Sequence, residues 1–123
     1  MSRILIADDD AHIRNVVALK LRNAGFDVEA VENGQQGIAA FEAQRPDLII
    51  TDYQMPIVDG VEMCRSIIGL PGGEAVPKIL LTARGFSLDD ETVESLRLSE
   101  ILSKPFSPRQ LLATVQSLLI QAA

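Results

Sequence analysis

The chain has 123 residues and a formal net charge of −6, a length that suits one globular domain. Its composition, 47% hydrophobic and 23% charged, is typical of a soluble protein with a normal core. The negative charge argues against direct binding to nucleic acid or to an anionic membrane, because both need basic patches.

Cysteine content and apolar runs bear on the location of the chain. A single cysteine, Cys64, excludes an internal disulfide and favours a reducing, cytoplasmic setting. The first residues lack the apolar region of a signal peptide, and no apolar stretch approaches the roughly 18 residues of a membrane span. We therefore expect a cytoplasmic chain that forms one domain over residues 1–123, with no room for a second.

Five apolar runs predict five short strands. The first run ends in Asp8-Asp9-Asp10, the third in Asp52 and the fourth in Thr82, while the fifth leads to Lys104. The second run alternates like an edge strand. The predicted strands are 3–8, 27–31, 47–52, 77–82 and 100–103.

A helical pattern follows each strand, and start and stop residues delimit the helices. Asp10 is expected to cap the first helix, and Gly25 is placed to end it. Asn33 with Gln36, and Asp59 with Glu62, have the spacing of a capping box. The predicted helices are about 11–24, 33–45, 59–69, 87–98 and 107–121.

The last two helices have their own start signals. Ser87, followed by a run of acids, is the expected cap of the fourth helix, since acids favour the positive end of the helix dipole. Ser107 followed by Pro108 and Gln110 gives a cap, a proline at the first helical position and a glutamine at the third.

Five alternations of strand and helix predict an α/β protein with a parallel sheet, right-handed crossovers and helices on both faces. A doubly wound (βα)₅ sheet of about 120 residues favours the flavodoxin-like strand order 2-1-3-4-5 over the larger Rossmann type. No G-x-G-x-x-G follows the first strand. The acids in that turn would repel a dinucleotide pyrophosphate or a flavin phosphate.

The carboxyl ends of parallel strands meet at one edge of the sheet, where ligands bind. Asp8, Asp9 and Asp52 should converge there, and carboxylates so close together raise one another's pKa. A hard divalent cation resolves this repulsion, and oxygen-only ligation favours Mg²⁺. Thr82 and Lys104 add a hydroxyl and a positive charge, which completes a pocket for a phosphoryl group. Asp52 is the better nucleophile, because the adjacent acids form a pair suited to the metal.

Four segments, ILIADDD, DLIITDYQMPIVDG, KILLTA and ILSKPF, carry these residues. In their order and spacing the chain resembles the receiver domain of two-component response regulators, and the resemblance covers essentially residues 1–123. It implies a CheY-like, single-domain response regulator. Such a protein accepts a phosphoryl group as 4-aspartylphosphate on Asp52, from a sensor histidine kinase or a histidine phosphotransfer protein.

The resemblance also implies the roles of the site residues. Thr82 would be the switch hydroxyl and Lys104 would contact the phosphoryl group, with a cis peptide bond between Lys104 and Pro105. The cofactor would be Mg²⁺, with Mn²⁺ able to substitute, and Asp9 would be its more direct ligand. The implied metal ligands are Asp8, Asp9, Asp52 and the backbone carbonyl of Gln54.

The sequence departs from the family pattern where the signal should leave the site. Ile101 occupies the position at which the family has an aromatic residue. Either Ile101 repacks without a ring flip, or the signal leaves through Arg84-Gly85-Phe86, with Phe86 as a substitute aromatic. Gln54 and Arg84 lie at the two positions that tune hydrolysis of the phosphoryl group in the family.

Output is expected through a downstream protein that binds the face formed by residues 87–121, from a monomer or a phosphorylation-dependent dimer. The chain would promote only its own phosphorylation and dephosphorylation, so it would not be a conventional enzyme. One alternative is a pseudo-receiver, an interaction module that works without phosphorylation. An aspartate-nucleophile phosphatase is disfavoured, because Gln54 stands where that chemistry needs a second acid.

Four other residues have structural interpretations. His12 is expected to be an exposed residue of the first helical turn, and Cys64 a packing residue of a helix rather than a redox centre. Arg14 and Arg65 are expected to be surface charges that could meet an acidic partner.

Overall fold

The computed structural model describes residues 2–83 and 88–122. Strands and helices alternate along this part of the chain, as the sequence predicts. The strands are β1 (Arg3–Ala7), β2 (Asp27–Val31), β3 (Leu48–Asp52), β4 (Lys78–Thr82) and β5 (Glu100–Ser103). The helices are α1 (Ala11–Asn23), α2 (Gly34–Ala43), α3 (Gly60–Ile68), α4 (Asp90–Ser95) and α5 (Pro108–Ala122).

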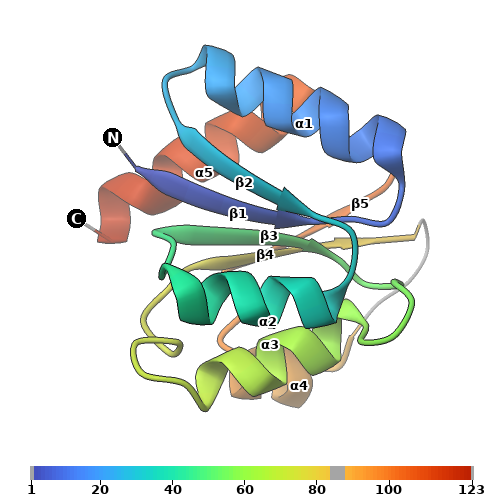
Figure 1. Ribbon diagram of the computed structural model, residues 1–123, viewed down its shortest axis with the longest axis vertical. Helices are drawn as coiled ribbons and strands as arrows, with labels where there is room; N and C mark the ends of the chain where they lie inside the picture. Colours follow the sequence, from blue (N-terminus) through green and yellow to red (C-terminus); the bar gives the residue numbers. More distant parts are fainter. Residues whose placement is uncertain (1, 84–87, 123) are drawn as a thin grey trace.

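The described strands form one parallel sheet in the order β2-β1-β3-β4-β5. Helices α1 and α5 cover one face, and α2, α3 and α4 lie on the other (Figure 1). This arrangement confirms the predicted doubly wound α/β fold and its flavodoxin-like strand order. No described helix is long and apolar enough to cross a membrane.

Two apolar cores lie on the two faces of the sheet. Along β1, Ile4 and Ile6 pack in the core beneath α1 and α5, while Leu5 and Ala7 pack in the core beneath α2 and α3. The alternation arises because successive side chains of a strand point to opposite faces. Burial on both faces explains why the strands read as continuous apolar runs. Each buried aliphatic side chain contributes about 1.5–3 kcal/mol.

Side-chain caps begin the helices where the sequence predicts them. The carboxylate of Asp10 accepts from the backbone N–H groups of the first turn of α1. The Asn33 side chain accepts from Gln36 N at 2.8 Å, and Asp59 accepts from Glu62 N at 2.8 Å. These contacts satisfy N–H groups that have no partner within the helix.

The fourth helix is shorter than the predicted range 87–98. Helix α4 is capped by Asp89, whose carboxylate accepts from Thr92 N at 2.7 Å. The expected cap, Ser87, lies outside the described residues. The helix ends before Arg97, which has a φ of 56° that a helix cannot continue. None of its own residues is buried, and Leu96, directly after it, is 1% exposed.

The loop after β3 turns tightly beside the carboxyl edge of the sheet. Val58 N–H donates to the Pro56 carbonyl at 2.8 Å, across Ile57, whose φ is 73°. A positive φ is unusual for a β-branched residue and marks a strained turn. Gly60 then passes so close to the backbone of Asp52 that a Cβ would collide with its carbonyl oxygen. The loop therefore holds the end of β3 against the start of α3.

Candidate functional site

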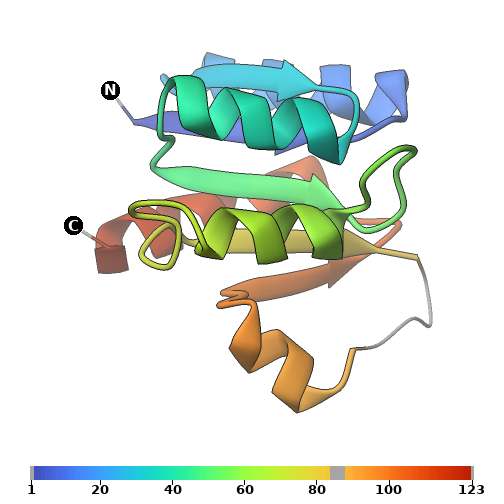
Figure 2. The same ribbon diagram turned by 60° about the horizontal axis from the view of Figure 1, so that its bottom comes forward.

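The polar strand ends meet at one edge of the sheet. Residue Ala7 of β1 is in register with Thr51 of β3, Asp52 with Leu81, and Thr82 with Ser103. Figure 2 shows the strand arrows pointing to this edge from a second angle. The edge carries Asp8, Asp9, Asp52, Thr82 and Lys104, as the sequence predicts.

Three carboxylates form a close cluster. Asp8, Asp9 and Asp52 each offer one oxygen, and these oxygens lie within 4.8 Å of one another. Asp8 is fully buried, Asp52 is 8% exposed, and Asp9 is exposed to solvent. Burial raises the pKa of Asp8, and burial together with the charge of Asp8 raises the pKa of Asp52. The cluster therefore concentrates negative charge that is poorly solvated.

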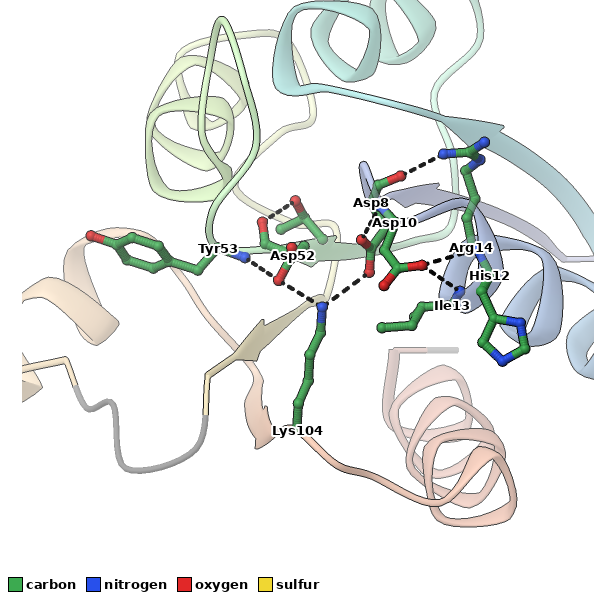
Figure 3. A network of polar contacts seen from close by, with 9 residues as sticks. Asp8, Asp10, His12, Ile13, Arg14, Asp52, Tyr53 and Lys104 are labelled. Carbon is green, nitrogen blue, oxygen red and sulfur yellow. Dashed lines mark hydrogen bonds and ion pairs between the residues drawn. The ribbon is translucent and has the colours of Figure 1, made fainter.

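Lys104 partly neutralises this cluster. Its ammonium Nζ lies 3.2 Å from Asp52 Oδ1 and 3.5 Å from Asp8 Oδ2 (Figure 3). Burial lowers the pKa of Lys104, but the two carboxylates outweigh burial and the net shift is upward. The Lys104–Pro105 peptide is cis, as the resemblance implied. Lys104 N also donates to Thr82 O at 2.7 Å, which ties the lysine to the end of β4.

Backbone groups hold the buried acids in place. Asp10 N donates to Asp8 Oδ1 at 2.9 Å, and Tyr53 N donates to Asp52 Oδ1 at 3.0 Å. The Thr51 hydroxyl donates to the Asp52 carbonyl at 3.0 Å. Because each carboxylate takes a backbone N–H, both are oriented before any ligand arrives.

The hydroxyl of Thr82 differs from the other buried polar groups. Thr82 is 1% exposed, and Oγ1 has no hydrogen-bond partner among the described residues. Leaving a buried hydroxyl unpaired costs about 1–3 kcal/mol. An unpaired donor at the edge that carries the acids and Lys104 fits a site built for an additional group.

Asp9, Asp52 and Lys104 line a pocket of about 380 Å³. Gln54, an exposed residue of the loop after β3, contributes to its wall. Three carboxylates, a backbone carbonyl and open space for water match the oxygen ligands that Mg²⁺ prefers, so the residues present fit such an ion. The pocket is lined by Asp9, Asp10, Asp52, Tyr53, Gln54, Ala83 and Lys104.

An apolar groove of about 490 Å³ adjoins the acidic pocket and shares Lys104 with it. One wall comes from α1 and the other from the segment between β5 and α5. The exposed imidazole of His12 lies at this groove, as expected for a residue of the first turn. The groove is lined by His12, Ile13, Val16, Val17, Lys104, Pro105, Phe106 and Pro108.

The residues expected to carry the signal are only partly described. Ile101 lies in β5, half-buried and in register with Leu80 of β4. Arg84 and Phe86 lie outside the described residues. Cys64 is buried, which raises the pKa of its thiol to about 12, and this supports its interpretation as a packing residue.

Sequence reasoning missed one buried and one mostly buried basic side chain. The side chain of Arg14, expected on the surface, is only 15% exposed and donates to the Asp8 carbonyl at 2.8 Å. Lys78 is fully buried, and its ammonium donates to the carbonyls of Gly73 and Val76. The position of Arg14, the fourth residue of α1, was a usable signal, because long helical side chains point back toward the N-terminus.

Comparisons with known proteins agree with this geometry. The family model described as response regulator receiver domain matches residues 4–116. The chain is 36% identical over 118 residues to the phosphate regulon transcriptional regulatory protein PhoB of Pseudomonas aeruginosa, covering 94% of this chain and 51% of that protein. The chain thus spans about half the length of the curated relatives it matches.

Two solved structures show the same likeness. Chemotaxis response regulator CheY4 of Vibrio cholerae has a TM-score of 0.87 at 30% identity, covering 95% of this chain and 98% of that chain. The receiver domain of a sensor histidine kinase from Pseudomonas aeruginosa PAO1, solved with a magnesium ion coordinated in its active site cleft, has a TM-score of 0.85 at 31% identity. The coverage there is 96% of this chain and 97% of that chain.

Proposed function

This chain belongs to the response regulator receiver family of two-component signalling, and from that premise we propose that Asp52 is its phosphoacceptor. The donor is the phosphohistidine of a sensor histidine kinase or of a histidine phosphotransfer protein. Receiver domains are phosphoacceptor signalling modules, and this chain promotes only its own phosphorylation and dephosphorylation. The observation that carries the proposal is the buried carboxylate of Asp52, whose Oδ1 lies 3.2 Å from Lys104 Nζ. The Thr82 hydroxyl, at the same edge of the sheet, has no hydrogen-bond partner among the described residues.

The transfer requires little covalent chemistry from the protein. One carboxylate oxygen of Asp52 attacks the phosphorus atom, an O–P bond forms and the N–P bond to the donor imidazole breaks. The leaving imidazole keeps the bonding electron pair and takes up a proton. Lys104 contributes its positive charge to the transferring phosphoryl oxygens, which reduces their repulsion by the acids.

The metal ion would be Mg²⁺, with Mn²⁺ as a substitute, and it would be held by Asp8, Asp9, Asp52 and the backbone carbonyl of Gln54. The ion supplies charge neutralisation between the acids and the phosphoryl oxygens. Support comes from the cluster of carboxylate oxygens within 4.8 Å and from the coordinated magnesium ion of the related kinase receiver domain. Lys104 and the backbone N–H groups of Asp10 and Tyr53 keep two of the acids oriented.

The signal leaves through the end of β4. In the phosphorylated state the Thr82 hydroxyl donates to a phosphoryl oxygen, which satisfies a buried group that otherwise has no described partner. Thr82 O accepts from Lys104 N, so a displacement of the end of β4 also displaces the end of β5. The half-buried Ile101 then repacks in place of an aromatic ring, and the face of residues 87–121 presents the change to a downstream protein.

The phosphodonor protein docks over the apolar groove between α1 and the start of α5. This groove adjoins the acidic pocket, and Val16 on its wall is 37% exposed. Val16→Asp is expected to slow transfer from a phosphorylated protein donor at least tenfold while leaving labelling by acetyl phosphate within twofold. Equal transfer from the protein donor to both forms would exclude this docking site.

The phosphoacceptor proposal is tested with acetyl phosphate, with and without Mg²⁺, and intact mass as the readout. Wild type is expected to gain one phosphoryl group only with the metal, and Asp52→Asn none. Asp90→Asn, an exposed acid of α4, is the matched control and should label like wild type. Labelling that survives Asp52→Asn would exclude Asp52, and folded wild type that never labels would favour a pseudo-receiver.

A further inference from the structure

Arg14 extends from α1 back over the end of β1. Its Nη1 donates to the backbone carbonyl of Asp8 at 2.8 Å, and its Nη2 lies 3.6 Å from Glu32 Oε1 (Figure 3 shows the contact with Asp8). The side chain is only 15% exposed. A guanidinium so enclosed is fixed in one geometry, because its planar fork has two oxygen partners.

Asp8 has a partner for each of its polar groups. Its N–H donates to Val31 O at 3.1 Å, its Oδ1 accepts from Asp10 N, and its Oδ2 lies 3.5 Å from Lys104 Nζ. The carbonyl accepts from Arg14. Asp8 is fully buried, so its carbonyl is shielded from solvent. Arg14 is therefore the side chain that holds the Asp8 carbonyl, and this carbonyl takes no part in the proposed chemistry.

We propose that Arg14 is a positioning residue for the cation site, which fixes the backbone of Asp8 so that the carboxylates of Asp8 and Asp9 are held ready for a divalent cation. The inference builds on the proposed function, since it concerns the same acids. Glu32, just after β2, is part of the device, because it shares the guanidinium with the Asp8 carbonyl.

Two opposite effects of Arg14 on a bound cation are possible, and the geometry separates them. Its positive charge would weaken cation binding, so removing it would tighten binding. Its hold on Asp8 would strengthen binding, so removing it would weaken binding. The guanidinium contacts a neutral carbonyl, and its charge is offset by the carboxylate of Glu32, whose Oε1 lies 3.6 Å from Nη2. The positioning effect should therefore dominate.

The experiment measures Mg²⁺ affinity of the full chain by calorimetry and by the fluorescence of Tyr53. Tyr53 is the only tyrosine, there is no tryptophan, and its backbone N–H binds the Asp52 carboxylate. Arg14→Gln is expected to weaken Mg²⁺ binding about tenfold, the lower end of the effect of groups that orient metal ligands. Arg14→Lys, which keeps the charge and one donor, should recover part of the loss.

Two controls separate positioning from charge and from folding. Arg65→Gln removes the same charge from the exposed face of α3 and should leave Mg²⁺ affinity unchanged. The NMR signal of the Asp10 N–H, which binds Asp8 Oδ1, should shift in Arg14→Gln but not in Arg65→Gln. Thermal unfolding without Mg²⁺ confirms that each variant is folded, and Arg14→Lys replaces Arg14→Gln if the latter is not.

The inference is overturned if folded Arg14→Gln binds Mg²⁺ as tightly as wild type or more tightly. It is also overturned if Arg65→Gln causes the same loss. Failure of the proposed function would look different: wild type would bind Mg²⁺ but remain unlabelled by acetyl phosphate at Asp52, and the ratio of Mg²⁺ affinities would still decide the role of Arg14.

Discussion

Two lysines, one buried and one half-buried, occupy opposite ends of the sheet and have opposite surroundings. Lys104, after β5, lies between the carboxylates of Asp8 and Asp52, which raise its pKa above that of an ordinary lysine in spite of burial. Lys78 begins β4 at the other end, fully buried, and donates to the carbonyls of Gly73 and Val76. There burial lowers the pKa of the ammonium.

The contrast separates a lysine suited to chemistry from one that supports structure. The charge of Lys104 faces a pocket, where a ligand can exchange for its carboxylate contacts. The ammonium of Lys78 binds neutral oxygens in the chain that leads into β4, so its donors are committed to the fold. Burial alone therefore does not identify a functional lysine, whereas the partners of its ammonium do.

The largest expected effect comes from removing the charge of the pocket lysine. Lys104→Gln should slow labelling of Asp52 by acetyl phosphate about a hundredfold or more, the usual effect of losing one group that stabilises developing charge. Lys78→Gln is the matched change at the other end of the sheet. Its labelling rate per folded molecule should stay within about twofold of wild type. Equal losses of labelling rate in both variants would contradict the distinction between a functional Lys104 and a structural Lys78.

For the free energy of unfolding, replacing Lys78 should have a larger effect than replacing Lys104. Lys78→Met keeps the length of the side chain but deprives two buried carbonyls of a charged donor, so the free energy of unfolding should fall by about 2 kcal/mol. Urea denaturation measures this difference. Lys104→Met serves as the comparison, and a larger loss of stability there would contradict the structural role assigned to Lys78.

The ionised acids around Lys104 should lower the free energy of unfolding when no cation is bound. The pKa of Asp52 is raised above 3.8 in the folded protein, so the folded protein holds this proton more tightly than the unfolded chain. The stability that this proton contributes is complete below pH 3.8 and is lost as the pH rises through the folded-state pKa. At neutral pH, Asp52→Asn should therefore raise the unfolding free energy by about 1 kcal/mol, or Tm by about 3–5 °C. The gain should shrink as pH is lowered toward 4, and Asp90→Asn should show no gain.

The smallest effect is the pH dependence due to Lys78. Its folded-state pKa is lowered from 10.5, so the folded protein binds fewer protons than the unfolded chain between that lowered value and 10.5. Stability from this group should rise with pH across that window. Lys78→Met should flatten the rise, which denaturation at pH 7 to 10 can measure. An identical slope in both proteins would mean that the ammonium is not desolvated.

The sequence predicted features set by local pattern better than those set by packing. Strand β5 and the caps Asp10, Asn33 and Asp59 were predicted correctly, because each depends on neighbouring residues. The start of α4 was not, because several residues before it can cap a helix and the structure uses Asp89.

The site shows the same division. Asp8, Asp9, Asp52, Thr82 and Lys104 could be placed together, because parallel strands bring their carboxyl ends to one edge. Their phosphoryl and metal roles stay predictions that labelling will test. The contacts of Arg14 and Lys78 with carbonyls a few residues away were missed. The direction of a helical side chain could have indicated the first contact, but nothing in the sequence marks the carbonyls that Lys78 binds.

Helix α4 has an unusual attachment to the rest of the protein. None of the residues Asp90–Ser95 is buried, and the nearly inaccessible Leu96 follows immediately. A segment with so few buried apolar contacts opens at low free energy, so its amide hydrogens should exchange early, long before those of β3. A binding protein could then select a detached or tilted conformation of α4 without unfolding the sheet. Different binding proteins could therefore stabilise different conformations of this helix.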